Sequence, residues 1–172
     1  EGQISEAENV PFSVVFQENR LLEHLTVLQN VMLGSDKNRE EAGLDLLKAF
    51  RLYEERNSYP SSLSGGMQRR VSLARALCFA GDVLILDEPF KGLDRELKQE
   101  AMRIVSEYYR GKLILMISHD MSEAVEFADE ILFVKGLPFQ ITRVLCPETP
   151  AGQRSESEKR SLELAFDDDE EN

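Results

Sequence analysis

Unbroken apolar runs alternate with helically spaced apolar residues along this chain of 172 residues. The runs at residues 83–86 and 113–117 contain only Val, Leu, Ile and Met, which is typical of strands covered on both faces of a sheet. A shorter run at residues 14–16 predicts another buried strand, which ends at Gln17. A helical repeat over residues 94–109 separates the two longer runs, so the order of elements predicts an α/β fold with a parallel sheet.

The segment between the first two strands has helical apolar spacing. Three helices are predicted there, at residues 26–33, 36–50 and 64–79. Thr26 and Ser64 stand where the first and third would begin, and a hydroxyl at that position caps backbone N–H groups. We therefore interpret residues from about 26 to 80 as a helical subdomain inserted into the α/β domain.

The chain continues with a short helix at residues 122–128 and two strands at residues 130–134 and 139–145. Residues 135–138, Lys-Gly-Leu-Pro, have the glycine and proline of a turn that joins those two strands. These elements complete a predicted α/β domain over residues 1–147.

Residues 148–172 no longer follow this pattern. They contain nine acidic and three basic residues, a net charge of −6 out of −12 for the whole chain. Residues 155–166 predict one helix, whereas the run of like charges at residues 167–171 is expected to be disordered. We interpret this segment as an acidic, partly disordered tail that keeps the protein in solution, with a regulatory role as the alternative.

Charge and cysteine content narrow the classes of function. The acidic balance argues against nucleic acid as a partner, because binding to phosphates requires a basic face. Cys78 and Cys146 lie far apart at no metal-binding spacing, which favours reduced thiols in a cytosolic protein. No apolar run approaches the ~20 residues that a membrane-spanning helix needs.

Three short motifs each suit the binding of a nucleotide phosphate. Residues 64–66, Ser-Gly-Gly, open a helix, where backbone N–H groups and the positive end of the dipole attract anions. Asp87 and Glu88 end a strand, where open α/β sheets bind ligands, and such carboxylates hold Mg²⁺ or orient an attacking water. His119 follows the last long apolar run and can donate to a phosphate oxygen. Taken singly, each motif also fits a plainer interpretation: a capped helix, a solvated strand end or an incidental histidine.

In this order and at these spacings the motifs resemble those of the ATP-binding cassette (ABC) ATPases. The resemblance covers approximately residues 10–145 and is most specific over residues 63–77 and 83–94. It implies a partial P-loop NTPase fold of the RecA type, with ATP and Mg²⁺ as cofactors. Met-Gln-Arg-Arg at residues 67–70, followed by Asp-Glu-Pro-Phe at residues 87–90, resembles the ATPase subunits of nitrate, sulfonate and taurine importers.

The resemblance implies a role for each candidate residue. Glu88 would be the catalytic base, and Asp87 would hold the magnesium ion. Gln17 would contact that ion and the attacking water, and His119 would sense the γ-phosphate. Six residues would act between two subunits, either by contacting the ATP bound to the opposite subunit or by crossing the dimer interface. They are Ser64, Gly65, Gly66, Met67, Gln68 and Asp94.

The resemblance also implies partners and a location. Two copies would form a homodimer with two composite ATP sites. Residues 18–33 would contact transmembrane permease subunits, which places the protein in the cytoplasm, peripheral on the inner face of the cell membrane.

Two other functions are alternatives. The first is a non-hydrolytic ABC-like regulatory module. The presence of the glutamine, the two carboxylates and the histidine argues against it, because a site that does not hydrolyse ATP has no physical need for all four. The second is an ABC-type ATPase that acts on DNA or ribosomes. That class would show sustained heptads between Gln17 and Ser64, or a second cassette, and this sequence has neither.

One part of the family pattern is absent from the sequence. No segment reads Gly-x-x-x-x-Gly-Lys-Ser/Thr, the Walker A loop that grips the β- and γ-phosphates and that precedes Gln17 in the family. Residues 1–4 resemble the strand after the family's first helix, so we expect an N-terminal truncation. The missing strand would lie inside the sheet, beside the strand that ends in Asp87, and the chain alone would be poorly stable, oligomerised or reorganised.

We predict that the 172-residue chain by itself neither binds Mg-ATP with micromolar affinity nor hydrolyses it, because it contains no phosphate-gripping loop. Isothermal titration calorimetry with Mg-ATP measures this directly. Binding that appears only when the upstream coding segment is added back would agree with the prediction. Micromolar binding by the chain alone would contradict it, and would mean that the site is completed in another way.

Overall fold

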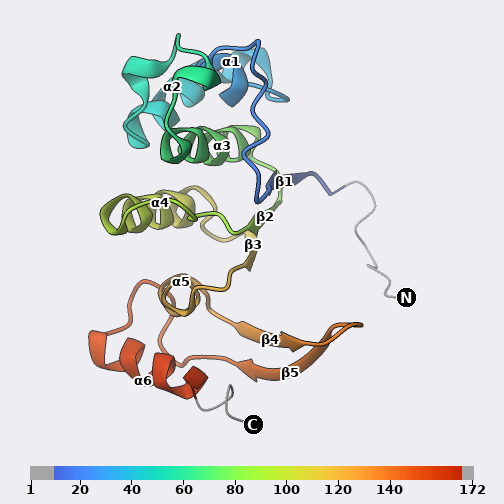
Figure 1. Cartoon of the computed structure of the whole chain (residues 1–172), viewed down its shortest axis with the longest axis vertical. Helices are drawn as coiled ribbons and strands as arrows, with labels where there is room; N and C mark the ends of the chain where they lie inside the picture. The colour runs from blue at the N-terminus through green and yellow to red at the C-terminus, as the bar shows by residue number, and fades with distance from the viewer. Residues whose placement is uncertain (1–9, 168–172) are drawn as a thin grey trace. The chain divides into compact units, whose positions relative to one another are not determined.

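The computed structural model describes residues 10–167. Contacts divide this part of the chain into two compact units, one up to Ile117 and the other from Ser118 onward. The first unit holds a three-stranded sheet and α1 to α4, and the second a two-stranded sheet with α5 and α6 (Figure 1). No helix within residues 10–167 has the length and apolar character needed to cross a bilayer.

The first unit contains the parallel sheet that the sequence predicts. Its strands are β1 (Phe12–Val15), β2 (Val83–Asp87) and β3 (Leu113–Ile117), in the order β1-β2-β3. Val15 is the register partner of Leu86, and Asp87 is the partner of Ile117. Because β2 is hydrogen-bonded on both sides, the expectation of a missing strand beside the strand of Asp87 is wrong: neighbours already occupy both of its edges.

Three α-helices lie between β1 and β2 in the sequence, where three helices are predicted, and this part of the first unit is called the helical subdomain below. The helical segments are α1 (Val27–Val31), α2 (Glu40–Ala49) and α3 (Gly65–Phe79), with short 3₁₀ turns at Lys37–Arg39, Tyr53–Glu55 and Pro60–Ser62. Both α1 and α2 pack against α3, and α3 packs against β1. The second predicted helix thus begins with a 3₁₀ turn, and α3 is the element that joins the subdomain to the sheet.

The predicted caps at the starts of α1 and α3 are confirmed. Thr26 Oγ1 accepts from the Gln29 N–H at 3.3 Å, and the Gln29 side chain accepts from the Thr26 N–H at 2.9 Å, which forms a capping box. Ser64 Oγ accepts from the Met67 N–H at 3.3 Å. Local hydrogen bonding therefore fixes where these two helices start.

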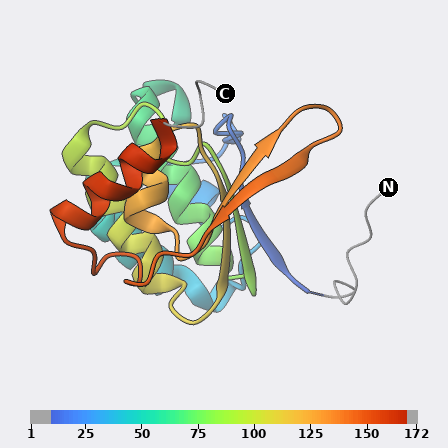
Figure 2. The same cartoon turned by 90° about the horizontal axis from the view of Figure 1, so that it is seen from below.

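One face of the three-stranded sheet is covered, and the other is open among the described residues. Leu84 and Leu86 of β2 are fully buried on the covered face. On the opposite face, Leu113, Leu115 and Ile117 of β3 are 64%, 50% and 56% exposed. The helix α4 (Arg95–Tyr108) lies on the same side of the strands as α3 (Figure 2). The expectation that the apolar runs are covered on both faces is therefore wrong for β3.

The second unit combines a β-hairpin with two helices. Its elements are α5 (Met121–Phe127), β4 (Ile131–Lys135), β5 (Gln140–Leu145) and α6 (Glu156–Asp167), close to the predicted bounds. The strands β4 and β5 pair antiparallel. Val125 and Ile131 form the core of this unit, and Leu162 of α6 packs against them. The predicted helix in the acidic segment is thus confirmed and extends to Asp167, whereas the rest of the like-charged run, residues 168–171, lies outside the described residues.

Polar contacts tie the acidic segment to α5. The Arg154 guanidinium donates to the carbonyl oxygens of Thr149 at 2.9 Å, Ala128 at 2.8 Å and Val125. Lys159 of α6 forms an ion pair with Glu126 of α5. These contacts explain how a segment with few apolar residues packs against the hairpin unit.

A glycine where α3 leads into β2 marks a very close approach of two backbone segments. A Cβ at Gly81 would lie 2.6 Å from the Pro11 carbonyl oxygen and 2.7 Å from the Ser13 nitrogen. The Gly81 N–H donates to Ser13 Oγ at 2.9 Å, and the Tyr109 hydroxyl donates to the same oxygen at 2.7 Å. This buried tie holds the start of β1 against the start of β2 and the end of α4.

We predict that Gly81→Ala lowers the free energy of unfolding by about 1–3 kcal/mol, because the added methyl group overlaps backbone atoms that cannot rotate away. Urea denaturation of the chain measures the change. Gly65→Ala is the matched control, since a Cβ there meets no atom within 4 Å, and its effect should stay within about 0.5 kcal/mol. Equal destabilisation by both substitutions would contradict the prediction.

Candidate nucleotide-binding site

The loops that follow β1 and β2 leave the sheet at the same edge. Because Val15 and Leu86 are partners in parallel strands, Gln17 and Glu88, each two residues farther along, begin adjacent loops. The carboxyl edge of a parallel sheet is where open α/β proteins bind ligands. The structure thus brings Gln17, Asp87 and Glu88 to one edge of the first unit.

The backbone of Glu88 has a left-handed conformation. Its φ angle is +48°, a region that costs a residue with a side chain about 1–3 kcal/mol. The Glu88 N–H donates to the Ile117 carbonyl at 2.9 Å, and the Glu88 carbonyl accepts from the Arg69 guanidinium. Contacts on both sides of the residue therefore hold the turn that carries the two carboxylates.

Arg69 of α3 is buried between these two loops, with 3% of its surface exposed. Helical spacing in the sequence predicts a buried stripe of Val71, Ala74, Leu77 and Cys78 on this helix, with Arg69 near or off it, and the burial of Arg69 shows that this is wrong. Its Nη1 donates to the Phe16 carbonyl at 2.5 Å and the Gln17 carbonyl at 3.3 Å. Its Nη2 donates to the Asp87 carbonyl at 2.8 Å. In the sequence, the one indication that Arg69 belongs to the site is its position three residues after the Ser-Gly-Gly motif.

The Ser-Gly-Gly motif begins α3 with an exposed glycine. Gly65 has open space around it, so no packing contact accounts for the missing side chain. A Cβ at Gly66 would lie 3.4 Å from the Gly92 carbonyl oxygen. The first N–H groups of a helix have no acceptor within the helix, so this end of α3 has the donors that an anion needs.

Met67 and Gln68 make different hydrogen bonds at this helix start. Met67 is half-buried and its N–H is bound to Ser64 Oγ. Gln68 Nε2 donates to the carbonyls of Pro60 at 3.0 Å and Leu63 at 3.4 Å. The Gln68 side chain therefore holds the turn that precedes the motif.

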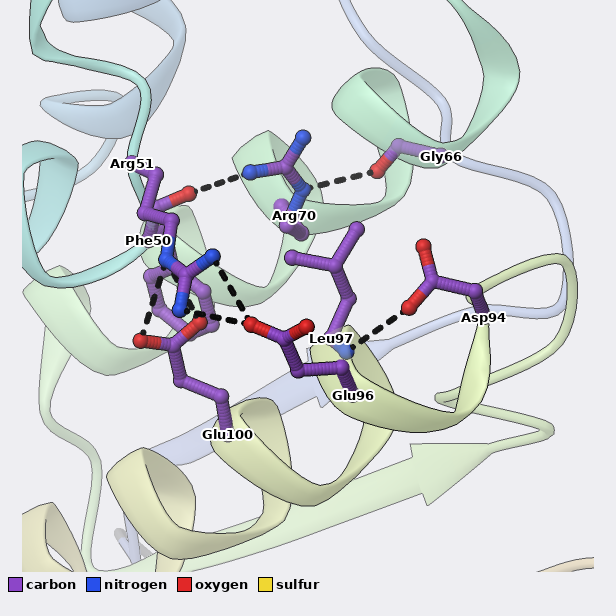
Figure 3. A network of polar contacts seen from close by, with 8 residues as sticks. All are labelled: Phe50, Arg51, Gly66, Arg70, Asp94, Glu96, Leu97 and Glu100. Carbon is purple, nitrogen blue, oxygen red and sulfur yellow. Dashed lines mark hydrogen bonds and ion pairs between the residues drawn. The ribbon is translucent and has the colours of Figure 1, made fainter.

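Asp94 lies at the start of α4, near the same helix end. Its Oδ1 accepts from the Leu97 N–H at 3.0 Å, so the carboxylate caps α4 (Figure 3). The loop before Asp94 includes Gly92, whose carbonyl lies against Gly66. The structure thus brings the predicted interface aspartate and the Ser-Gly-Gly motif into one neighbourhood.

Two arginines connect the helical subdomain to this neighbourhood. Arg70 donates to the Phe50 carbonyl at 2.5 Å and the Gly66 carbonyl at 3.4 Å, and burial lowers the pKa of its guanidinium (Figure 3). Arg51 pairs with Glu96 at 3.2 Å and Glu100 at 3.0 Å, and these carboxylates raise its pKa, Glu96 most. The corner that follows α2 is thereby joined to both α3 and α4.

His119 belongs to the second unit, where its side chain is exposed. It follows Ile117, the last residue of β3, by two positions along the chain. Asp120 beside it caps α5 by accepting from the Ser122 N–H at 3.0 Å. A local hydrogen bond therefore fixes the chain just after the histidine that is predicted to sense the γ-phosphate.

No cluster of three or more His, Cys, Asp or Glu residues suited to a metal ion occurs within the described residues. The Asp87-Glu88 pair offers two carboxylates at the sheet edge, and both residues are half-buried. Mg²⁺ is usually held by one or two carboxylates together with substrate phosphates and water. The residues present fit that kind of site, and they do not form a complete metal cage.

The order of these residues matches a known family over more than half of the chain. Residues 2–91 match the family described as "ABC transporter". The chain belongs to the ABC transporter family. The matched part of this ABC chain includes Gln17, the Ser-Gly-Gly motif and the Asp87-Glu88 turn, and the family resemblance is confirmed.

Curated ABC relatives agree with this result. The chain is 40% identical to an aliphatic sulfonates import ATP-binding protein of Shouchella clausii (strain KSM-K16), over 71% of this chain and 50% of that protein. It is 38% identical to an arginine transport ATP-binding protein of Bacillus subtilis (strain 168), over 74% of this chain and 55% of that protein. The chain thus spans about half the length of the curated relatives it matches.

Solved ABC cassettes share the fold. A dimeric ATP-binding cassette in a post-hydrolysis state, bound to ADP and phosphate, superimposes with a TM-score of 0.70 at 28% identity. The match covers 80% of this chain and 63% of the cassette. The predicted P-loop NTPase type of α/β fold is therefore confirmed.

We predict that Glu88→Gly is more stable than Glu88→Ala by about 1 kcal/mol, because only glycine adopts the left-handed backbone without a steric cost. Both variants lack the carboxylate, so the comparison isolates the backbone. At Arg103, inside α4, we expect the reverse: Arg103→Ala should be more stable than Arg103→Gly by about 1 kcal/mol. Urea denaturation measures both differences, and the same order at both sites would contradict the prediction.

Proposed function

We propose that this chain is part of the ATP-hydrolysing subunit that drives substrate import through an ABC transporter. The observation that carries the proposal is the meeting of the Gln17 loop and the Asp87-Glu88 turn at one sheet edge, with Glu88 in a left-handed backbone. The names of the sulfonate and arginine relatives, both import or transport ATP-binding proteins, support it. We assign residues 1–147 to the ATPase domain and residues 148–172 to a C-terminal segment.

The catalytic roles follow from the chemistry of phosphoryl transfer. Bound Mg²⁺ would neutralise charge that develops on the phosphates. Asp87 and Gln17 would hold the ion, and Glu88 would accept the proton of the attacking water. His119 donates to the γ-phosphate. The half-buried carboxylates beside Gln17 support these assignments, since a water between them and a phosphate would be oriented from two sides.

The Ser-Gly-Gly end of α3 serves the ATP of a second copy. Backbone N–H groups at Gly65 and Gly66 donate to its phosphate, and Ser64 and Met67 flank the contact. The exposure and open space at Gly65 support this role, because a phosphate can approach the backbone there. Gln68 and Asp94 keep the adjoining turns in place. The dimeric state of a solved cassette with ADP and phosphate supports a homodimer.

The remaining partners are permease subunits of the membrane. We assign residues 18–33 to the contact with them, which puts the subunit on the inner, cytoplasmic face of the membrane. Relatives at 40%, 38% and 35% identity are all named as ATP-binding proteins, but their names give different substrates: aliphatic sulfonates, arginine and glycine betaine/proline betaine. Substrate choice therefore belongs to other subunits.

We predict that Glu88→Gln in the full-length gene product lowers the turnover number for ATP about 100-fold or more, because the amide cannot accept the proton of water. Binding of Mg-ATP, followed by calorimetry, should stay unchanged. Glu107→Gln is the matched control: this exposed glutamate pairs with Arg103 on α4, away from the sheet edge, and its loss should not change hydrolysis.

Full hydrolysis by Glu88→Gln would contradict the proposed base. An unaltered protein that binds Mg-ATP and never hydrolyses it would instead favour the non-hydrolytic regulatory module.

A further inference from the structure

Arg69 reaches two loops that the sequence keeps far apart. On one side its Nη1 donates to the carbonyls of Phe16 and Gln17, and it approaches Asn19 Oδ1 at 3.5 Å. On the other side its Nε donates to the Pro89 carbonyl at 2.7 Å, and its Nη2 donates to the carbonyls of residues 87 and 88. One buried side chain therefore contacts both the loop at residues 16–19 and the turn at residues 87–89.

The chemistry of the guanidinium makes this contact a rigid one. Its five N–H donors lie in one plane at fixed angles, so acceptors bound on opposite sides are fixed relative to each other. The acceptors are mostly backbone carbonyls, which move only when the loop itself moves. Any displacement of one loop must therefore break hydrogen bonds of Arg69 or carry the guanidinium with it.

A second arginine of α3 contacts only the first of these loops. Arg75 donates to the Asn19 carbonyl at 3.0 Å and to the Arg20 carbonyl at 2.8 Å. Within the part of the chain that the structure describes, Arg75 makes no hydrogen bond to the turn at residues 87–89. The helix thus offers a natural comparison: one arginine that bridges the two loops, and one that holds a single loop.

We propose that Arg69 is a positioning residue that ties the loop of Gln17 to the turn of Asp87 and Glu88, so that both loops move as one. The proposal rests on the proposed ATPase function, and it adds a residue to which no role in the reaction was assigned. Arg69 sets the backbone of Glu88 from one side while the Ile117 carbonyl holds it from the other. Through Arg69, a partner that shifts residues 18–33 also shifts the catalytic carboxylates.

Amide hydrogen exchange tests the tie without any measurement of activity. In the full-length gene product, Arg69→Gln should speed exchange in peptides that cover both residues 16–20 and residues 87–90. Arg75→Gln should speed exchange in the first peptide only. Equal protection of residues 87–90 in Arg69→Gln and in the unaltered protein would overturn the proposal.

Steady-state kinetics test the consequence for the reaction. Arg69→Gln should lower the turnover number for ATP about 10- to 100-fold while the KM for ATP stays nearly unchanged, since misplacement of a catalytic group acts on the chemical step. Arg69→Lys keeps the charge but has no planar fork, so one loop is released and the turnover number should remain low. Full recovery by lysine would overturn the proposal, because charge alone would then suffice.

A fallback variant, a control variant and one further outcome keep the test of Arg69 distinct from the test of the proposed ATPase function. If Arg69→Gln does not fold, Arg69→Lys carries both measurements. Arg103→Gln, an exposed substitution on α4, should leave exchange and turnover unchanged. An unaltered protein with no ATPase activity, but with coupled exchange of the two loops, would reject the proposed function while supporting the tie.

Discussion

The parallel pairing of β1 with β2 determines where the other features of the first unit lie. With Val15 opposite Leu86, the loops that carry Gln17 and Glu88 start side by side. A slip of one residue would turn the buried Ser13 and Val15 from the covered face to the open face, so burial specifies this register strongly. The helix α3 packs on the covered face at β1, and a side chain from its second turn thereby reaches both loops.

The buried guanidinium of Arg69 and the backbone carbonyls at the ends of β1 and β2 satisfy each other's hydrogen bonds. Backbone carbonyls just beyond a strand have no partner in the sheet, and a buried guanidinium is costly unless its N–H groups are bound. In this fold the carbonyls of Phe16, Asp87 and Pro89 accept from Arg69. The left-handed backbone of Glu88 is tolerated because contacts on both sides hold it.

The helical subdomain is attached to the rest of the first unit mainly through α3. This helix is shared: α1 and α2 pack on it from one direction, and β1 and α4 from others. The ion pairs that the exposed Arg51 forms with Glu96 and Glu100 contribute little to stability, because solvent screens the charge of Arg51. Packing on α3 therefore contributes most to holding the subdomain in place. Arg51 and Arg70 add polar contacts at the turn after Phe50.

Local chemistry made the elements and their caps predictable from the sequence. Apolar runs marked all three parallel strands, and the hydroxyls of Thr26 and Ser64 marked two helix starts, because both signals act over a few residues. The motifs that carry the family were readable for the same reason, since Ser-Gly-Gly and Asp-Glu each belong to one turn. The comparisons confirmed that family.

Two features depended on contacts between distant segments, and the sequence predicted them wrongly. Leu113 and Leu115 were expected to be covered, but coverage of a strand depends on which element lies across it. Arg69 was expected near or off the buried stripe of α3. Its burial depends on the carbonyls of Gln17 and Pro89, which lie 52 and 20 residues away in the chain. The sequence by itself determined the elements and the family, and the tertiary structure alone decided which polar side chain joins the two loops of the site, because only packing brings their carbonyls together.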